Sequence, residues 1–362
     1  MIARFSVFSP NPWGDGGARR SAQISELLGR TGRESTMIGF PVEARRSLSL
    51  AGLIGEAAFL VRCGIPFSLR ADVLFTLGND LRFFRKCLRQ FQPGTLFLWE
   101  ATHSRFACLP FLAKEYGHRV VGLPHNLESL VPANRSFFTK KVAPRWLPEE
   151  MRALAACDHV FAISREDQWL LRLHGVSAEF LPYTPPQQVA EAMMKIRSSR
   201  EDVEQGRDLI LLGTAANRPT YLGLLDRLEF FARHAHSFGT LHVVGYGTER
   251  LRNVLPNGMN VVLHGEVDFE QLRRLLCIVR AAIVHQVPTS GALTRIPELL
   301  TAGVPVLANV DAARSFFGAQ GVAVYESDEH LLEMLEGGLD MFCLPASCPH
   351  GVLEFLRFVK DH

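Results

Sequence analysis

The sequence lacks the patterns by which several classes of protein are recognised. It has no CxxC pair, and its seven cysteines are widely spread, at positions 63, 87, 108, 157, 277, 343 and 348. This usage disfavours a disulfide framework or a structural zinc site, and it is typical of a reducing compartment. No apolar run reaches the ~20 residues that cross a bilayer, and the first residues resemble a strand rather than a signal peptide. We therefore expect a cytoplasmic protein.

Two nucleotide-binding patterns are also missing. No DxD is present, so the usual carboxylate pair for a metal-bound nucleotide diphosphate is absent, and no glycine loop has the full GxGxxG spacing. We therefore expect neither a metal nor another cofactor. Nucleic acid is not expected as a partner either, because the pI is only about 8.2 and no platform of aromatic and basic residues stands out.

Charge is divided unevenly along the 362 residues. Residues 1–185 contain 23 Lys or Arg and 16 Asp or Glu, a net charge of +7, whereas the remainder carries −5. The whole-chain value of +2 hides this difference. Such asymmetry indicates an anionic partner for the first half only.

Apolar runs bounded by turn signals alternate with helix-like segments. The runs are residues 4–8, 35–40, 95–99, 119–123, 159–163 and 179–181, then 208–212, 240–244, 259–263, 281–284, 304–309 and 322–325. This alternation predicts an α/β protein with parallel sheets covered on both faces. Because ligands bind at the carboxyl ends of parallel strands, we expect two doubly wound, Rossmann-like domains that face each other across a cleft.

The expected domain boundaries follow from changes in composition. We assign residues 1–185 to an N-terminal domain and 207–345 to a C-terminal domain. The polar segment 186–206, which follows a run of prolines, is the expected linker. We expect residues 346–362 to form a C-terminal helix that crosses back to the N-terminal domain.

The most informative stretch is residues 281–310, AAIVHQVPTSGALTRIPELLTAGVPVLANV. It predicts two buried strands joined by a glycine-containing loop and a short helix capped by Thr294. The N–H groups before a helix can bind an anion, and Arg295 adds a charge suited to phosphate. Glu298, one turn later, could accept hydrogen bonds from ribose hydroxyls. The stretch indicates a nucleotide site; the alternative is an ordinary strand–loop–helix with a solvated Arg–Glu pair.

Other expected strand ends carry loops of similar character. Glycines there would let the backbone approach a ligand closely. They are Gly14, Gly16 and Gly17 after the first strand, and Gly213 and Gly245 after the first two strands of the second half. His125 follows the fourth strand, and Arg218 opens a helix after Gly213. The alternatives are a glycine-rich surface turn and a structural or solvated histidine.

Taken together, these segments resemble the GT-B glycosyltransferases, in particular the retaining family-4 type (glycosyl transferases group 1). The resemblance spans nearly the whole chain, and its last segment is the most specific. The segments are PNPWGDGGARRSAQISELLGRTG, CDHVFAISREDQWLLRLHGVSAEFLPYTPP, DLILLGTAANRPTYLGLLDRL, and LHVVGYGTERLRNVLPNGMNVVLHGEV with TSGALTRIPELLTAGVPVLAN. The family implies a nucleotide-sugar donor bound to the C-terminal domain, an acceptor bound to the N-terminal domain, and transfer without a metal.

The resemblance implies a role for each matching residue. Glu298 would hold the ribose, while Arg295 and the N–H groups from Gly291 to Thr294 would hold the diphosphate. The glycines that would approach the donor are Gly16, Gly17, Gly213 and Gly245. His125 would position the transferred sugar rather than act as a general base, and Glu128 would face the acceptor.

The sequence departs from the family pattern in two places. The first of the family's paired glutamates falls at Ser290, which can hydrogen-bond a sugar but carries no charge. The usual Arg…Lys pair after the first strand of the donor domain is reduced to Arg218. Both changes leave donor-sugar recognition open.

A basic helix indicates the kind of acceptor. In residues 80–91, four cations fall at i, i+3, i+4 and i+7, beside an apolar stripe, and the preceding residues 47–61 are strongly apolar. The cations are Arg82, Arg85, Lys86 and Arg89. A basic amphipathic helix can lie on anionic lipid, which predicts peripheral contact with the inner membrane face and a lipid-linked acceptor. The alternative is a solvated face on a core-packed helix.

The expected function is transfer of a sugar from a nucleotide diphosphate sugar to an acceptor hydroxyl with retention, in cell-surface polysaccharide or glycolipid synthesis. Two alternatives remain. One is a sugar-nucleotide epimerase of the same fold, and the other is a non-catalytic sugar-nucleotide-binding protein, which Ser290 keeps open.

Overall fold

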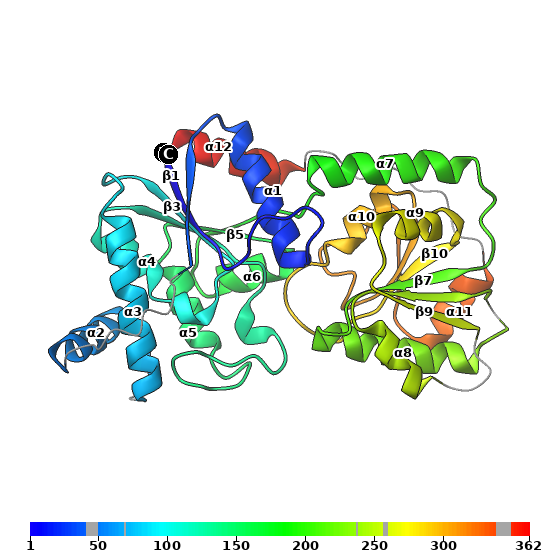
Figure 1. Ribbon diagram of the computed structural model, residues 1–362, viewed down its shortest axis with the longest axis horizontal. Helices are drawn as coiled ribbons and strands as arrows, with labels where there is room; N and C mark the ends of the chain where they lie inside the picture. Colours follow the sequence, from blue (N-terminus) through cyan, green and yellow to red (C-terminus); the bar gives the residue numbers. More distant parts are fainter. Residues whose placement is uncertain (41–49, 69, 237, 256–259, 338–348) are drawn as a thin grey trace. The chain divides into compact units, whose positions relative to one another are not determined.

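The chain forms two α/β units in the computed structural model (Figure 1), which describes residues 1–40, 50–68, 70–236, 238–255, 260–337 and 349–362. Unit 1 contains Met1–Pro182 and the C-terminal helix, and unit 2 begins at Tyr183. The chain therefore leaves unit 1 three residues before the expected boundary at 185. The expected boundary at 345 lies outside the described residues.

Unit 1 is built on a six-stranded parallel sheet with the order β2-β1-β3-β4-β5-β6. Its strands are β1 (Ile2–Phe5), β2 (Ser35–Ile38), β3 (Leu96–Glu100), β4 (Arg119–Leu123), β5 (His159–Ala162) and β6 (Ala178–Phe180). Its helices are α1 (Gly16–Arg30), α2 (Leu50–Cys63), α3 (Ala71–Leu88), η1 (Ser104–Phe106), α4 (Leu109–Glu115), η2 (Glu128–Leu130), α5 (Leu147–Ala155), α6 (Arg165–Leu173) and α12 (His350–Asp361).

The two faces of the unit 1 sheet bury separate apolar clusters. On one face, α1 and α12 pack together against β1, β3, β4 and β5 (Figure 1). Val352, Phe355 and Val359 of α12 are buried in this cluster. Helices α2 to α6 contribute to the cluster on the other face. Both faces of this parallel sheet are therefore covered, as in other α/β proteins.

Unit 2 repeats this architecture, with the strand order β12-β11-β10-β7-β8-β9. Its strands are β7 (Leu209–Leu212), β8 (Leu241–Val244), β9 (Val261–Gly265), β10 (Ala281–Val284), β11 (Val306–Asn309) and β12 (Val322–Tyr325). Its helices are α7 (Gln187–Glu201), α8 (Arg218–Arg233), η3 (Thr248–Val254), α9 (Phe269–Ile278), α10 (Arg295–Thr301) and α11 (Asp328–Glu336). Helices α7, α9 and α10 cover one face, and α8 and α11 cover the other.

The strand pattern expected from the sequence is confirmed. Each of the twelve apolar runs contains or overlaps one of the strands in the two parallel sheets. The first strand starts two residues earlier than expected, because Arg4 lies inside it and is buried. The chain is therefore an α/β protein with two doubly wound sheets.

Helix α7 corrects the expected linker at residues 186–206. Three apolar side chains at i, i+4 and i+7 are buried in the core of unit 2: Val189, Met193 and Ile196. Arg197 donates to the carbonyls of Leu300 and Thr301 at the end of α10, and Arg200 to those that end α9. Cations at helix C-termini satisfy carbonyls that have no partner within the helix. The charges that favoured a linker therefore bind α7 to its neighbours.

Candidate active site

The loops after β7 and β8 touch through their backbones in unit 2. Gly245 has a φ of +142°, which favours glycine, and a Cβ built there would overlap the carbonyl oxygen of Gly213. A Cβ on Gly213 would overlap Thr220 and lie 2.9 Å from Nη1 of Arg295. The two glycines that the sequence singled out therefore lie beside each other, and the Arg295 guanidinium reaches the first.

Arg295 carries a positive charge that no acidic side chain in the described part of the chain neutralises. Among the residues that the structure describes, its guanidinium has no hydrogen-bond or ion-pair partner; its Nε is buried, and the residue as a whole is half-buried. Burial lowers the pKa of Arg295 to about 10, so the group stays protonated at neutral pH. Burying an unpaired cation is unfavourable, and an anion such as a diphosphate would offset that cost.

Glu298 lies three residues after Arg295, on the same face of α10. Its side chain is 5% exposed, and its Oε1 accepts a 2.8 Å hydrogen bond from the hydroxyl of Tyr183. Because Arg295 pairs with none of the described residues, the alternative of a solvated Arg–Glu pair is wrong. Tyr183 is a partner that the sequence analysis missed, because 115 residues separate it from Glu298.

The expected N-cap at Thr294 is wrong. Thr294 has helical dihedrals (φ −60°, ψ −29°) and makes no side-chain capping bond, since a cap requires an extended backbone. Helix α10 is only seven residues long, so its dipole adds little. The loop turns instead at Gly291, whose φ is +84°, and Arg314 donates to the carbonyls of Thr289 and Gly291. Arg314 therefore fixes the loop that carries Ser290, a role the sequence did not indicate.

Arg218 is the first residue of α8 and is exposed. It follows the turn in which the Asn217 N–H donates to the Thr214 carbonyl, after Gly213. The side chain of Asn217 does not cap the helix. Arg218 therefore begins the helix that follows the β7 loop, and its contact with an anion bound at Arg295 stays a prediction.

His125 lies at the carboxyl end of the unit 1 sheet in a buried ionic cluster. Its Nε2 is 3.3 Å from Oε1 of Glu100, and Arg4 forms an ion pair with Oε2 of Glu100 at 2.5 Å. Glu100 is fully buried, and Arg4 is 3% exposed. The sequence predicted the histidine but neither partner, although a charged residue inside an apolar strand was a signal for Arg4.

The charges of this cluster are set by burial and by its pairing. Burial raises the pKa of Glu100, but the neighbouring His125 and the charge of Arg4 more than offset it and lower the pKa to about 2. Burial lowers the pKa of His125, although Glu100 acts to raise it. The histidine is therefore a neutral imidazole at physiological pH, held beside a carboxylate. That state suits a positioning group.

Strain marks the same strand end. Ala101, directly after Glu100, has a φ of +50° and is buried. A residue with a Cβ is disfavoured in the left-handed region, and such strain often accompanies functional sites. The Ala101 N–H donates to the carbonyl of Leu123 at the end of β4. The strained residue thus ties together the ends of β3 and β4, which carry Glu100 and His125.

The glycine loop after β1 supports His125 through Phe8. The Phe8 ring stacks on the imidazole, with 5.4 Å between ring centroids. A Cβ on Gly17 would lie 2.5 Å from that ring, so the contact with Phe8 requires a glycine there. Gly16 is the exposed first residue of α1, which Asp15 caps through the N–H of Ala18. Close approach of a ligand to Gly16 and Gly17 stays a prediction.

Glu128 is held in the loop after β4 by amide side chains. Asn126 donates to its Oε1 at 2.6 Å, and Asn134 donates to its Oε2. Glu150 accepts from the N–H groups of Glu128 and Ser129 and so fixes the backbone beneath it. Burial raises the pKa of Glu128 to about 7. A carboxyl fixed in this way suits recognition of a hydroxyl.

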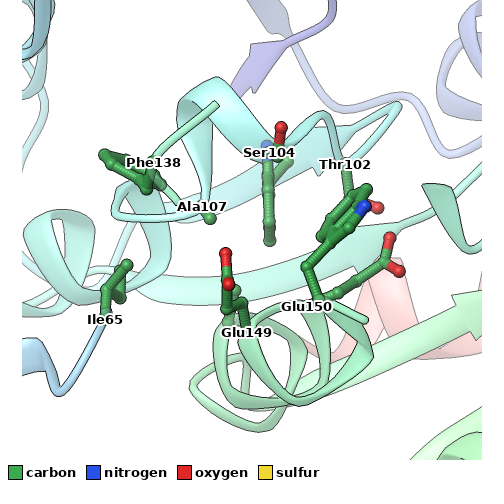
Figure 2. Close-up of a pocket in the computed structure, with 10 residues that line it drawn as sticks. Ile65, Thr102, Ser104, Ala107, Phe138, Glu149 and Glu150 are labelled. Carbon is green, nitrogen blue, oxygen red and sulfur yellow. The ribbon is translucent and has the colours of Figure 1, made fainter. Parts of the chain in front are cut away.

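A small cavity lies behind this loop, inside unit 1. It has a volume of about 10 Å³, with Thr102 and Ser104 on one side and Glu149 and Glu150 of α5 on the other (Figure 2). Trp99 and Trp146 also line it, and their buried indole N–H groups have no hydrogen-bond partner among the described residues. This volume holds about one water molecule. The cavity is therefore too small for a sugar.

Only some of the cations on the basic helix α3 are available to contact a membrane surface. Arg85 of α3 forms two hydrogen bonds with the buried Glu56 of α2, at 2.5 and 2.9 Å, so it is a structural residue rather than a membrane contact. Arg82, Lys86 and Arg89 are exposed. On α2, Ile54 and Val61 are 62% and 67% exposed. No helix among the described residues is long and apolar enough to cross a membrane.

Within the residues that the structure describes, no group of three or more His, Cys, Asp or Glu side chains is arranged to hold a metal ion.

The fold can be compared with known structures. The α,α-trehalose-6-phosphate synthase of Burkholderia multivorans superposes with a TM-score of 0.59 at 12% identity, over 92% of this chain and 88% of that one. WaaG, a glycosyltransferase of lipopolysaccharide biosynthesis, gives 0.55 at 15% identity, over 93% and 90%. HepE of Anabaena in complex with UDP-glucose gives 0.57 at 13% identity, over 92% and 88%.

No family model matches the sequence, and no curated protein matches it either. The structural matches cover nearly the whole of both chains. The chain therefore has the GT-B fold of glycosyltransferases. At these identities the likeness defines the fold alone.

Proposed function

We propose that the protein is a metal-independent glycosyltransferase that moves a sugar from a nucleotide diphosphate sugar to an acceptor hydroxyl with retention. The main support for the proposal is the arrangement of side chains on one face of α10 in unit 2. There an unpaired cation, Arg295, reaches the glycine-lined ends of β7 and β8, and Glu298 lies one turn further on. A cation can bind the diphosphate of a nucleotide, and a carboxylate one helical turn away can accept hydrogen bonds from its ribose hydroxyls.

The proposed mechanism is electrostatic. The bond between the sugar and the diphosphate breaks, and negative charge collects on the leaving diphosphate. A cation fixed before the reaction stabilises that charge without reorganisation, and such groups contribute about 10²–10³-fold to rate. Arg295 is the main candidate, with Arg218 as a second cation. In unit 1, the neutral His125 positions the transferred sugar, and Glu128 binds the acceptor hydroxyl.

The test is binding of nucleoside diphosphates by calorimetry, followed by turnover. UDP and ADP are the first probes, because HepE was solved with UDP and a starch synthase of Arabidopsis with ADP. We expect one nucleotide to bind, and Arg295→Ala and Glu298→Ala each to weaken it at least about tenfold, since each loses a charged contact. Arg274→Ala removes an exposed cation that pairs with Glu270 and is the matched control.

The products separate the remaining functions. Release of the nucleotide with a sugar transferred, or hydrolysed to water, supports the transferase. An epimerised donor would identify an epimerase of the same fold. Tight binding without turnover would favour a binding protein, the reading that Ser290 keeps open. Absence of binding to any nucleoside diphosphate would overturn the proposal.

We further propose that unit 1 contacts the cytoplasmic face of an anionic membrane and that the acceptor is lipid-linked. The support is the exposed apolar pair Ile54 and Val61 on α2 and the exposed cations of α3, on helices joined by the Arg85–Glu56 pair. Near such a surface each cation contributes about 1 kcal/mol. Replacing Arg82, Lys86 and Arg89 with Glu should therefore reduce binding to phosphatidylglycerol vesicles about a hundredfold or more, with phosphatidylcholine vesicles as the control. If the wild-type protein does not bind anionic vesicles at low salt, the proposed membrane contact is refuted.

A further inference from the structure

Tyr183 reaches the proposed donor site from the first residue of unit 2. Its side chain is 4% exposed, and its hydroxyl donates the 2.8 Å hydrogen bond to Oε1 of Glu298. The preceding residue, Pro182, is fixed within unit 1, where its carbonyl accepts hydrogen bonds from Arg20 and Gln23 of α1. The chain thus enters unit 2 at Tyr183, and the hydroxyl of this residue contacts Glu298 of the same unit.

A glutamate side chain has three rotatable bonds, and ordering it is a cost that binding has to meet. A ribose presents two neighbouring hydroxyls to a carboxylate, so the carboxylate must already lie in the correct plane to accept from both. The bond to Tyr183 occupies one lone pair of Oε1 and fixes that plane.

Arg295 does not perform this task, although it is three residues away on the same helix. Its guanidinium lies beside Gly213 and pairs with none of the described residues. The Tyr183 hydroxyl therefore contacts Glu298, whereas the Arg295 guanidinium lies beside Gly213 after β7. This separation makes a defect in one distinguishable from a defect in the other.

We infer that Tyr183 is a positioning residue that orients Glu298 for the ribose of the donor nucleotide. The inference rests on the proposed function, because it takes Glu298 as the ribose ligand. It predicts that Tyr183 acts on affinity through the ribose hydroxyls only.

The experiment pairs a protein change with a ligand change. Calorimetry is done on the wild type and Tyr183→Phe with UDP and ADP, and then with the 2′,3′-dideoxy form of the nucleotide that binds. We expect Tyr183→Phe to weaken the ribonucleotide about two- to tenfold, the cost of ordering one flexible side chain on binding, and to leave dideoxynucleotide affinity unchanged. Tyr325→Phe removes another buried hydroxyl of unit 2, one that contacts His285, and is the matched control.

The outcomes separate this inference from the proposed function. If no nucleoside diphosphate binds the wild type, both are overturned. If the nucleotide binds and Tyr183→Phe binds it equally well, only the positioning role is overturned. An equal loss for the ribo and dideoxy forms would also overturn it, because a general structural role would act on both ligands alike. Thermal unfolding of Tyr183→Phe shows whether the variant folds, and Tyr183→Leu gives a second test of the same bond.

Discussion

The buried cluster of unit 1 should respond measurably to neutralising Glu100. In Glu100→Gln the shape is kept, but the buried guanidinium of Arg4 loses its counter-charge. The difference between a pKa of about 2 and the ordinary 4.5 corresponds to about 3 kcal/mol in favour of the ionised folded state. Breaking one side of a buried ion pair costs about 3–5 kcal/mol by general experience. Both routes give a destabilisation of about 3 kcal/mol at neutral pH.

The sign of the pH dependence follows from the lowered pKa. A carboxyl whose pKa is lower in the folded state contributes stability that is fully present above pH 4.5 and lost as the pH falls toward 2. Wild type should lose this contribution and Glu100→Gln should not, because the variant has no carboxyl there. The difference between the two proteins should therefore be about 2 kcal/mol smaller at about pH 3 than at about pH 7.

Tryptophan fluorescence in urea measures this unit selectively. All four tryptophans of the chain lie in unit 1: Trp13, Trp99, Trp146 and Trp169. The double variant Arg4→Met/Glu100→Gln is the control and should recover most of the loss, because no charge is left buried alone. A loss below about 1 kcal/mol at neutral pH, or a loss that does not change with pH, would refute the assignment of an ionised pair.

Three further substitutions test other contacts. Gly213→Ala places a Cβ against Thr220 and 2.9 Å from Nη1 of Arg295, so it should destabilise unit 2 by about 1–3 kcal/mol and weaken nucleotide binding. Adding Thr220→Ser should restore part of the stability, because it removes the methyl group that the Cβ overlaps. Unchanged thermal unfolding of Gly213→Ala would contradict the overlap. Gly17→Ala should displace the Phe8 ring, at about 1–3 kcal/mol, and lower turnover more than nucleotide affinity; equal kinetics would show that Phe8 does not support His125. Arg85→Ala should destabilise unit 1 by about 1–3 kcal/mol because the buried Glu56 loses its partner, whereas the exposed Arg82→Ala should stay within about 0.5 kcal/mol; equal effects in urea unfolding would contradict the structural role of Arg85.

The sequence allowed the fold to be predicted because buried parallel strands are nearly continuous apolar runs. All twelve runs correspond to strands, although Arg4 interrupts one of them. Helix α7 was missed. Its buried positions, Val189, Met193 and Ile196, do have helical spacing, but prolines and charges around them favoured a linker. The charges of Arg197 and Arg200 are explained by hydrogen bonds to carbonyls at the ends of α10 and α9. These partners lie far away in the sequence, so no local pattern could predict them.

For the candidate site, the sequence by itself determined the members that are close together along the chain. Arg295 and Glu298 share one turn of helix, so their spacing alone places a cation and a carboxylate on one face. Only the tertiary structure decided their partners. It placed Arg295 beside Gly213 with no partner among the described residues, gave Glu298 the hydroxyl of Tyr183, and joined Arg4, Glu100 and His125 across three strands. The physical reason is that a parallel sheet brings the carboxyl ends of distant strands to one edge, and burial there lets each charge keep only the partners that packing supplies.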